Sequence, residues 1–523
     1  MRRTSLAVLT IALALVALAA PMAFAQAPAP KVTINGLIDN VTSYSRNVSL
    51  YDGVWNLNDK NWYARTRGRF DIRGELGKAK AVLGIEIDSA WGQTGASDTT
   101  GPNAFGTSGS WDLNTDTRGI IEIKWLYTEF PVPLIPIPTT ARVGAQPFGG
   151  AANYKLATYA NGDFAGVNVV SALTPNVKLL ATYVAVEEGL TGKQTVNNLA
   201  GPNGINPNRG DDFAYIVAAE VTPFKGLDIK PMFSGFHAQG ATSSSARHDR
   251  GGLDSGDFAA GGGINENRYT VGADARFRMG PFSLDPTVLY QFGNRGAIAP
   301  AEFAPSGSVT GKKYYANISA WLLDVRAGFQ LGPLLIQGLG VYTTGNKARE
   351  NTLDDVNYFQ PLDTDTSYLA DWGTQLTSLG LDYFSAMNEA QARVSYPGTS
   401  IGWDKYGRMQ LGLKATYAIT PALNIMAGAN GHWTAEEVDR NGTPVAGAGL
   451  VPAFTGGPRD NDRFLGTELM ALLNWRFAPG LTWANAVGYM FAGPALDAFT
   501  DPAVGGRNAK DSFIYTSRLR YSF

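Results

Sequence analysis

Residues 61 to 76 read Asn-Trp-Tyr-Ala-Arg-Thr-Arg-Gly-Arg-Phe-Asp-Ile-Arg-Gly-Glu-Leu, and polar and apolar side chains alternate along them. The even positions carry small or apolar residues, such as Trp62, Phe70 and Ile72. Successive side chains of a β-strand point to opposite faces, so this stretch predicts a strand with one apolar and one densely charged face. The charged positions are Arg65, Arg67, Arg69, Asp71, Arg73 and Glu75.

The same period of two recurs along the chain. Phe513, Tyr515 and Leu519 share one face of the C-terminal segment, and Arg518 and Arg520 share the other. Each of these stretches therefore predicts a strand with one charged face. Three further stretches set Ile121, Ile123, Trp125 and Tyr127 against Glu122 and Lys124, Val271 and Phe277 against Asp274, Arg276 and Arg278, and Leu323 and Val325 against Asp324 and Arg326.

The connections between these strands alternate strictly between short and long. Short turns such as Gly77-Lys78 and Gly280-Pro281 are followed by long polar stretches such as 93–117 and 345–404. A soluble sandwich also has alternating strands, but tight periplasmic turns and long external loops are typical of membrane barrels. The pattern predicts an all-β fold, a closed antiparallel transmembrane β-barrel of about 18 strands, with 16 as the alternative. The predicted strands run from 32–44 to 511–523 and include 118–131, 267–279, 282–293 and 405–419.

The N-terminus indicates export. Arg2 and Arg3 precede an apolar run over residues 6–20, and Ala23-Phe24-Ala25 supplies a small-x-small cleavage site. We therefore expect a signal peptide over 1–25, a linker over 26–31 and a single barrel domain over 32–523, with an uncleaved membrane helix as the alternative. The mature part has no apolar run of 18 residues, which excludes a helical membrane protein.

Composition excludes several functional classes. The 523 residues include no cysteine, which rules out disulfides, cysteine-ligated metals and thiol catalysis. The net charge of −2 gives no basic excess for nucleic acid. His237, His248 and His432 lie far apart, and no nucleophile elbow or phosphate loop is present. We expect no enzymatic activity and no cofactor or resident metal.

The chain resembles a Gram-negative outer-membrane porin. The export signal, the turn–loop alternation and the terminal Tyr521 and Phe523 carry this resemblance, although the glycine expected earlier in the last strand falls on Arg518. Residues 142–150 resemble the exit of a porin's fifth strand. The resemblance implies an outer-membrane location in contact with its lipid, recognition of Phe523 by the barrel-assembly machinery and an inward constriction loop over 145–162. A homotrimer is one option, and no subfamily is assigned.

A barrel of 16 to 18 strands is wide enough for an aqueous channel, so the lumen side chains are the candidate site. The last strand pairs with the first, which brings Arg518 and Arg520 near the arginines of residues 65–73. Such an arginine-rich wall would favour anionic or dipolar solutes. Alternatively, the arginines pair with Asp39, Asp71 and Glu75 and keep the wall rigid. The predicted pore-lining residues are Arg65, Arg67, Arg69, Asp71, Arg73, Glu75, Glu122, Lys124, Asp274, Arg276, Arg278, Asp324, Arg326, Arg408, Lys414, Arg518 and Arg520.

These observations predict a passive diffusion channel for small hydrophilic solutes. The alternatives are a barrel that sheathes or scaffolds a partner protein, and a soluble exported β-protein. The longest external loop, 345–404, is acidic and is interpreted as a solvated surface loop, or else as a lid. Its Asp363 and Asp365 offer a weak calcium site as a less favoured interpretation. The spaced apolar residues of 367–387 predict a short helix on the barrel mouth.

Overall fold

The computed structural model describes residues 29–47, 60–91, 120–148, 159–160, 162–187, 212–239, 263–298, 313–346, 355–362, 372, 406–438, 462–495 and 509–523. The predicted signal peptide, the first half of the linker, and Asp363 and Asp365 lie outside these residues. The same holds for the middle of the predicted constriction loop, for most of 345–404, and for the predicted helix 367–387 apart from Trp372.

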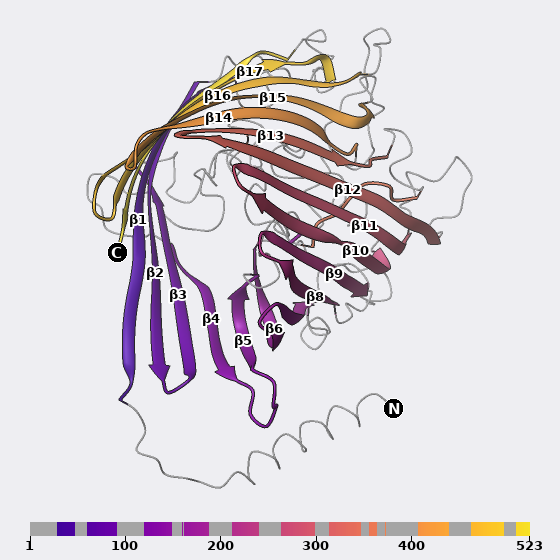
Figure 1. Ribbon diagram of the computed structural model, residues 1–523. Coiled ribbons are helices and arrows are strands. Elements are labelled where there is room, and N and C mark those ends of the chain that lie inside the picture. The colour runs from indigo at the N-terminus through magenta and orange to yellow at the C-terminus, as the bar shows by residue number, and fades with distance from the viewer. Residues whose placement is uncertain are drawn as a thin grey trace, which may run out of the picture.

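Eighteen antiparallel strands form one closed sheet (Figure 1). Each strand pairs with the next along the chain, and β1 pairs with both β2 and β18, so the ring has no edge. The prediction of a closed all-β barrel is confirmed, with 18 strands rather than 16. The strands are β1 (Lys31–Arg46), β2 (Lys60–Leu76), β3 (Ala79–Ala90), β4 (Ile120–Pro131), β5 (Thr139–Pro147), β6 (Asp163–Thr174), β7 (Val177–Glu187), β8 (Asp212–Phe224), β9 (Leu227–Gln239), β10 (Gly263–Met279), β11 (Phe282–Ile298), β12 (Lys313–Leu331), β13 (Leu334–Thr343), β14 (Met409–Thr420), β15 (Leu423–Val438), β16 (Asp462–Ala478), β17 (Leu481–Ala492) and β18 (Ser512–Ser522).

The strand boundaries lie close to those predicted. The largest differences are at the long-loop ends, where β10 begins at Gly263 rather than 267, β11 continues to Ile298 rather than 293, and β14 begins at Met409 rather than 405. The opposite ends close with tight turns, and Gly77, Gly280 and Gly332 adopt positive φ there. A side chain would be strained in this left-handed conformation, so glycine permits the reversal.

The outer face of the barrel is apolar. Trp62, Ile121, Ile123 and Leu411 are each more than 60% exposed and occupy outward positions of their strands. In a closed ring, the backbone N–H and C=O groups of every strand pair with those of its neighbours. The apolar outer side chains suit the hydrocarbon of a bilayer. A barrel that spans a membrane requires both features. Among the described residues, no helix is long and apolar enough to cross a bilayer.

One predicted face is wrong. We expected Trp125 and Tyr127 on the apolar face together with Ile121 and Ile123. The register between β3 and β4 shifts between Gly84 and Ile85, with Lys124 as the extra residue. Such a β-bulge inverts the alternation. Ile121 and Ile123 stay outside, whereas the side chains of Trp125 and Tyr127 turn into the lumen, where they contact Asp71 and Arg142.

Part of the lumen holds an apolar core. Inward side chains of β6 to β13, such as Ile216, Phe236 and Leu322, pack there. They share this core with side chains from outside the strands, among them Phe359 and Trp372. The interior of the described barrel is therefore narrowed on one side by the chain itself. The other side, around β1, β2, β3 and β18, is lined by charged groups.

Candidate functional site

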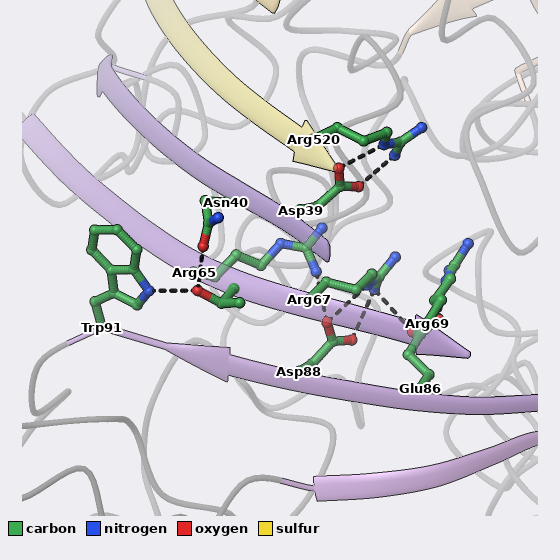
Figure 2. Close-up of polar contacts among 10 residues, drawn as sticks. Asp39, Asn40, Arg65, Arg67, Arg69, Glu86, Asp88, Trp91 and Arg520 are labelled. Atoms are coloured by element: carbon green, nitrogen blue, oxygen red, sulfur yellow. Dashed lines mark hydrogen bonds and ion pairs between the residues drawn. The ribbon is translucent and has the colours of Figure 1, made fainter. Parts of the chain in front are cut away.

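A charged wall lies where the ring closes. On β2, Arg65 Nη1 lies 3.1 Å from Asp88 Oδ1, and Arg67 donates to both oxygens of Asp88 at 2.8 and 2.9 Å (Figure 2). Arg67 also lies 3.1 Å from Glu86, which accepts a hydrogen bond from Arg69. Bidentate arginine–carboxylate pairs of this kind fix both partners in one geometry.

The seam between the first and last strands continues this wall. Arg520 of β18 donates through Nε and Nη2 to Asp39 of β1, and Asp39 is also in register with Arg67. In these contacts, four arginines lie among three carboxylates. The structure brings together four of the arginines predicted to form a wall, namely Arg65, Arg67, Arg69 and Arg520. It also places Asp39, Glu86 and Asp88 between them, whereas Asp71 and Glu75 were the expected partners in addition to Asp39.

Asp71 has a different partner. It accepts a hydrogen bond of 2.9 Å from the indole Nε1 of Trp125, the residue that the bulge turns inward. A Cβ atom at Gly84 would overlap that same indole. Gly84 therefore leaves the space in which Trp125 reaches Asp71.

We expect Gly84→Val to displace Trp125 and to lower the free energy of unfolding by about 1–3 kcal/mol, as overpacking does. The matched control is Gly74→Val, because a Cβ at Gly74 meets no atom within 4 Å. The measurement is urea unfolding of the folded barrel, followed by tryptophan fluorescence. Equal unfolding midpoints for the two variants would contradict the contact.

The other predicted residues are spread around the ring. Arg276 and Arg278 of β10 are exposed and pair with Asp228 and Asp285 near the short turns, on the side opposite the charged wall. Further contacts are Lys124 with Asp163 at 3.2 Å, Thr287 Oγ1 with Asp274 at 2.7 Å, Arg326 with Asp324 at 3.4 Å, and Arg408 Nη2 with Gln410 at 3.1 Å. Arg73, Glu75 and Arg518 are half-buried, and Glu122 is exposed. Their pore-lining role stays a prediction.

Two segments beyond strand ends meet inside the barrel. The hydroxyl of Tyr159, which follows β5, donates to Ser234 of β9 at 2.8 Å. The backbone N–H of Leu362, which follows β13, donates to the carbonyl of Tyr159 at 2.7 Å. Tyr159 and Leu362 are at most 1% exposed. These contacts hold both segments against the lumen wall at β9.

A second polar cluster surrounds Arg268 of β10, which is 0% exposed. Its Nη1 lies 3.1 Å from Glu266 and also donates to Gln360. Arg295 of β11 shares both partners, at 3.0 Å from Glu266 and 2.9 Å from Gln360. The cluster thus offers a buried guanidinium of which two nitrogen atoms, Nε and Nη2, have no hydrogen-bond partner among the described residues.

Sequence reasoning missed Arg268 as a lumen residue. Its even position in β10 matches those of Asp274, Arg276 and Arg278, so the alternation carried the signal. Gln360 carried none, because it lies outside the strands and reaches the cluster through the fold of residues 355–362.

Trp372, from the connection between β13 and β14, packs against the inner side of β14. It is 1% exposed, and its carbonyl accepts a hydrogen bond of 3.3 Å from Gln410 Nε2. The ammonium of Lys414 lies 4.2 Å from the centre of its ring, within the range of a cation–π contact. A Cβ at Gly412 would lie 2.9 Å from Trp372 Cε3. The predicted lumen residue Lys414 therefore lines, with Gly412, the space that the Trp372 indole occupies.

Comparisons with known proteins give only distant likenesses. No family model matches the chain, and no curated protein matches it. The chain is similar to OccAB1 of Acinetobacter baumannii, with 14% identity, coverage of 94% of this chain and 96% of that chain, and a TM-score of 0.47. It is also similar to the outer membrane protein opdK of Pseudomonas aeruginosa, with 11% identity, coverage of 94% and 99%, and a TM-score of 0.46. With TM-scores below 0.5, these likenesses carry no argument about function.

Proposed function

We propose that the chain is an outer-membrane diffusion channel for small hydrophilic solutes. The observation that carries this proposal is the closed ring of 18 strands with an apolar outside and a charged inside. A barrel of this strand number encloses more space than side chains of its own strands fill. Charged groups on the inner wall keep that space wet, so polar solutes meet no hydrocarbon barrier.

The inward segments favour a channel over a sheath for a protein partner. Phe148, Tyr159, Phe359 and Trp372 are almost fully buried in contacts with the lumen wall or with each other. They occupy cross-section that a partner protein would need. A narrowed channel passes small solutes and excludes large ones, which is the behaviour of a constriction.

We further propose a preference for anions. Four arginines line the charged wall, and Arg268 and Arg295 both contact the carboxylate of Glu266. Positive charges in a low-dielectric wall attract anions and repel cations. Recognition of Phe523 by the barrel-assembly machinery, a homotrimeric state and the absence of catalysis remain parts of the same proposal, supported by the sequence resemblance.

The test is single-channel recording of the purified protein in a planar bilayer under a salt gradient. We expect stable conductance steps and a reversal potential displaced toward that of the anion. A folded, heat-modifiable barrel that gives no conductance would overturn the channel. Steps without anion preference would retain the channel and remove the selectivity.

A further inference from the structure

Two aromatic side chains of β4, Trp125 and Tyr127, face the lumen and are only half-buried there. The β-bulge at Lys124 turns them inward, whereas regular alternation would have placed them against lipid. Apolar surface in contact with water is unfavourable, so an aromatic side chain exposed inside an aqueous channel is available to a passing solute. We call Trp125 and Tyr127 the aromatic platform.

The Trp125 indole lies flat against the lumen wall. A Cβ atom at Gly84 would overlap three adjoining atoms of its five-membered ring at once, namely Nε1, Cδ1 and Cε2. An indole that approached with its edge would not bring all three atoms so close. Nε1 also donates to Oδ1 of Asp71 at 2.9 Å, which fixes the orientation of the indole. One face of the indole therefore covers the backbone of β3, and the opposite face is turned to the lumen.

Polar side chains of β2 lie beside the aromatic platform. β2, β3 and β4 are neighbours in the sheet (Figure 1). Their register sets two rows side by side, Asp71 with Gly84 and Trp125, and Arg73 with Val82 and Tyr127. Gly84 has no side chain and Val82 is buried, so β3 is low between the two outer strands. A solute that packs on the indole therefore lies beside Asp71 and Arg73.

These polar groups have unused hydrogen-bonding atoms. Among the described residues, Oδ2 of Asp71 and the side chains of Arg73 and Glu75 take part in no hydrogen bond or ion pair. The guanidinium supplies N–H donors, and the two carboxylates supply acceptors. A hydroxyl group both donates and accepts, so a solute with several hydroxyls can use both kinds of partner.

The charges around the aromatic platform balance. Glu129, in the next row, pairs with Lys80 at 2.9 Å and with Arg142 at 2.8 Å. The charged side chains nearest the platform are thus three basic and three acidic ones, namely Arg73, Lys80 and Arg142, and Asp71, Glu75 and Glu129. Balanced charges give an anion little net attraction. These surroundings therefore favour an uncharged solute.

We propose that the aromatic platform, with Asp71 and Arg73, binds uncharged sugars in their cyclic form as they pass through the lumen. The C–H groups on the face of a sugar ring carry slight positive charge and pack against the negative face of the indole. Hydroxyl groups at the edge of the sugar then reach Asp71 and Arg73. This inference rests on the proposed diffusion channel and names a class of solute for it. The proposed anion preference belongs to other residues, those of the charged wall and of the Arg268 cluster.

The first experiment records ion current through the wild type while glucose or mannitol is added. Mannitol has nearly the same mass and carries hydroxyl groups, but it is an open chain and has no ring face. We expect glucose to block the current in a saturable manner, and mannitol to lower it only as far as it lowers the conductivity of the solution. Equal effects of glucose and mannitol would overturn the proposal. A tighter block by benzoate than by glucose would assign the platform to aromatic anions and also overturn it.

Variants then locate the block. Trp125→Ala should raise the half-blocking glucose concentration about fivefold, whereas Trp125→Phe, which retains an aromatic ring, should keep most of the block. The matched control is Trp62→Ala, because Trp62 is 65% exposed at an outward position of β2. Heat-modifiable migration shows that each variant is folded. An unchanged half-blocking concentration in Trp125→Ala, or an equal rise in Trp62→Ala, would contradict the site.

The second experiment does not depend on conductance. Saturation-transfer NMR is carried out with glucose and with mannitol on the protein in a detergent without a sugar headgroup. We expect transfer from aromatic protons of the protein to the ring C–H protons of glucose, loss of this transfer in Trp125→Ala, and none to mannitol. A barrel that conducts but shows neither block nor transfer would overturn this inference alone. A barrel that shows the transfer without conducting would overturn the proposed channel and leave the sugar site in place.

Discussion

Replacing Trp372 with alanine should enlarge the conducting path. The indole is fully buried against Lys414 and the glycine at 412, and the carbonyl of Trp372 accepts a hydrogen bond from Gln410. Removing a buried tryptophan costs about 3–5 kcal/mol. A loss of about 3 kcal/mol raises the population in which residue 372 is undocked from β14 on the order of 100-fold. The measurable result is a larger single-channel conductance with more transitions between levels.

The matched control is Trp321→Ala. Trp321 is 44% exposed on the outer face of β12, so its removal deletes the same side chain without touching the lumen. We expect wild-type conductance from this variant. If both variants conduct as the wild type does, Trp372 does not hold a constriction. If both conduct more, the effect reflects general loosening of the barrel.

The fold could be predicted because a membrane barrel repeats one rule. Successive side chains of each strand face lipid and the lumen in turn. The short turns contain residues such as Gly77 and Gly280, which tolerate positive φ. Local sequence carries both signals, and for this reason the strand number and most boundaries agree with the structure. The prediction failed at Trp125, because one extra residue in β4 inverts the alternation without a mark in local composition.

The candidate site was less accessible to prediction. The pairing of Arg520 with Asp39 follows from closing the ring, and the sequence alone suggested it. The pairing of Arg67 with Glu86 and Asp88 depends on the register of β2 with β3, which alternation does not determine. The contacts of Gln360 and Trp372 depend on how long segments fold back into the lumen. Such contacts are set by tertiary packing and have no local periodicity.

Replacing Arg268 with glutamine should shift the reversal potential toward that of the cation. Arg268 is fully buried and shares Glu266 with Arg295, and its Nε and Nη2 atoms have no hydrogen-bond partner in the described part of the chain. Even at the dielectric constant of water, one charge acts on an ion 4 Å away with about 1 kcal/mol, and the effect grows in a wall of lower dielectric constant. We expect the anion-to-cation permeability ratio to fall by about fivefold or more. Low salt favours the measurement, because the Debye length is about 10 Å at 0.1 M.

The neighbouring carboxylate provides a control of opposite sign. Glu266→Gln removes the negative charge that Arg268 and Arg295 share, so the reversal potential should move toward that of the anion. A second control, Arg46→Gln, removes an exposed charge at an outward position of β1 and should change nothing. If Arg268→Gln and Glu266→Gln shift the potential in the same direction, the effect is structural, and the field of this cluster does not select ions. If Arg46→Gln matches Arg268→Gln, net charge rather than a lumen site sets the preference. We expect Arg268→Gln and Glu266→Gln to shift the reversal potential in opposite directions and Arg46→Gln to leave it unchanged. This result would locate ion selectivity where residues 355–362 contact β10 and β11.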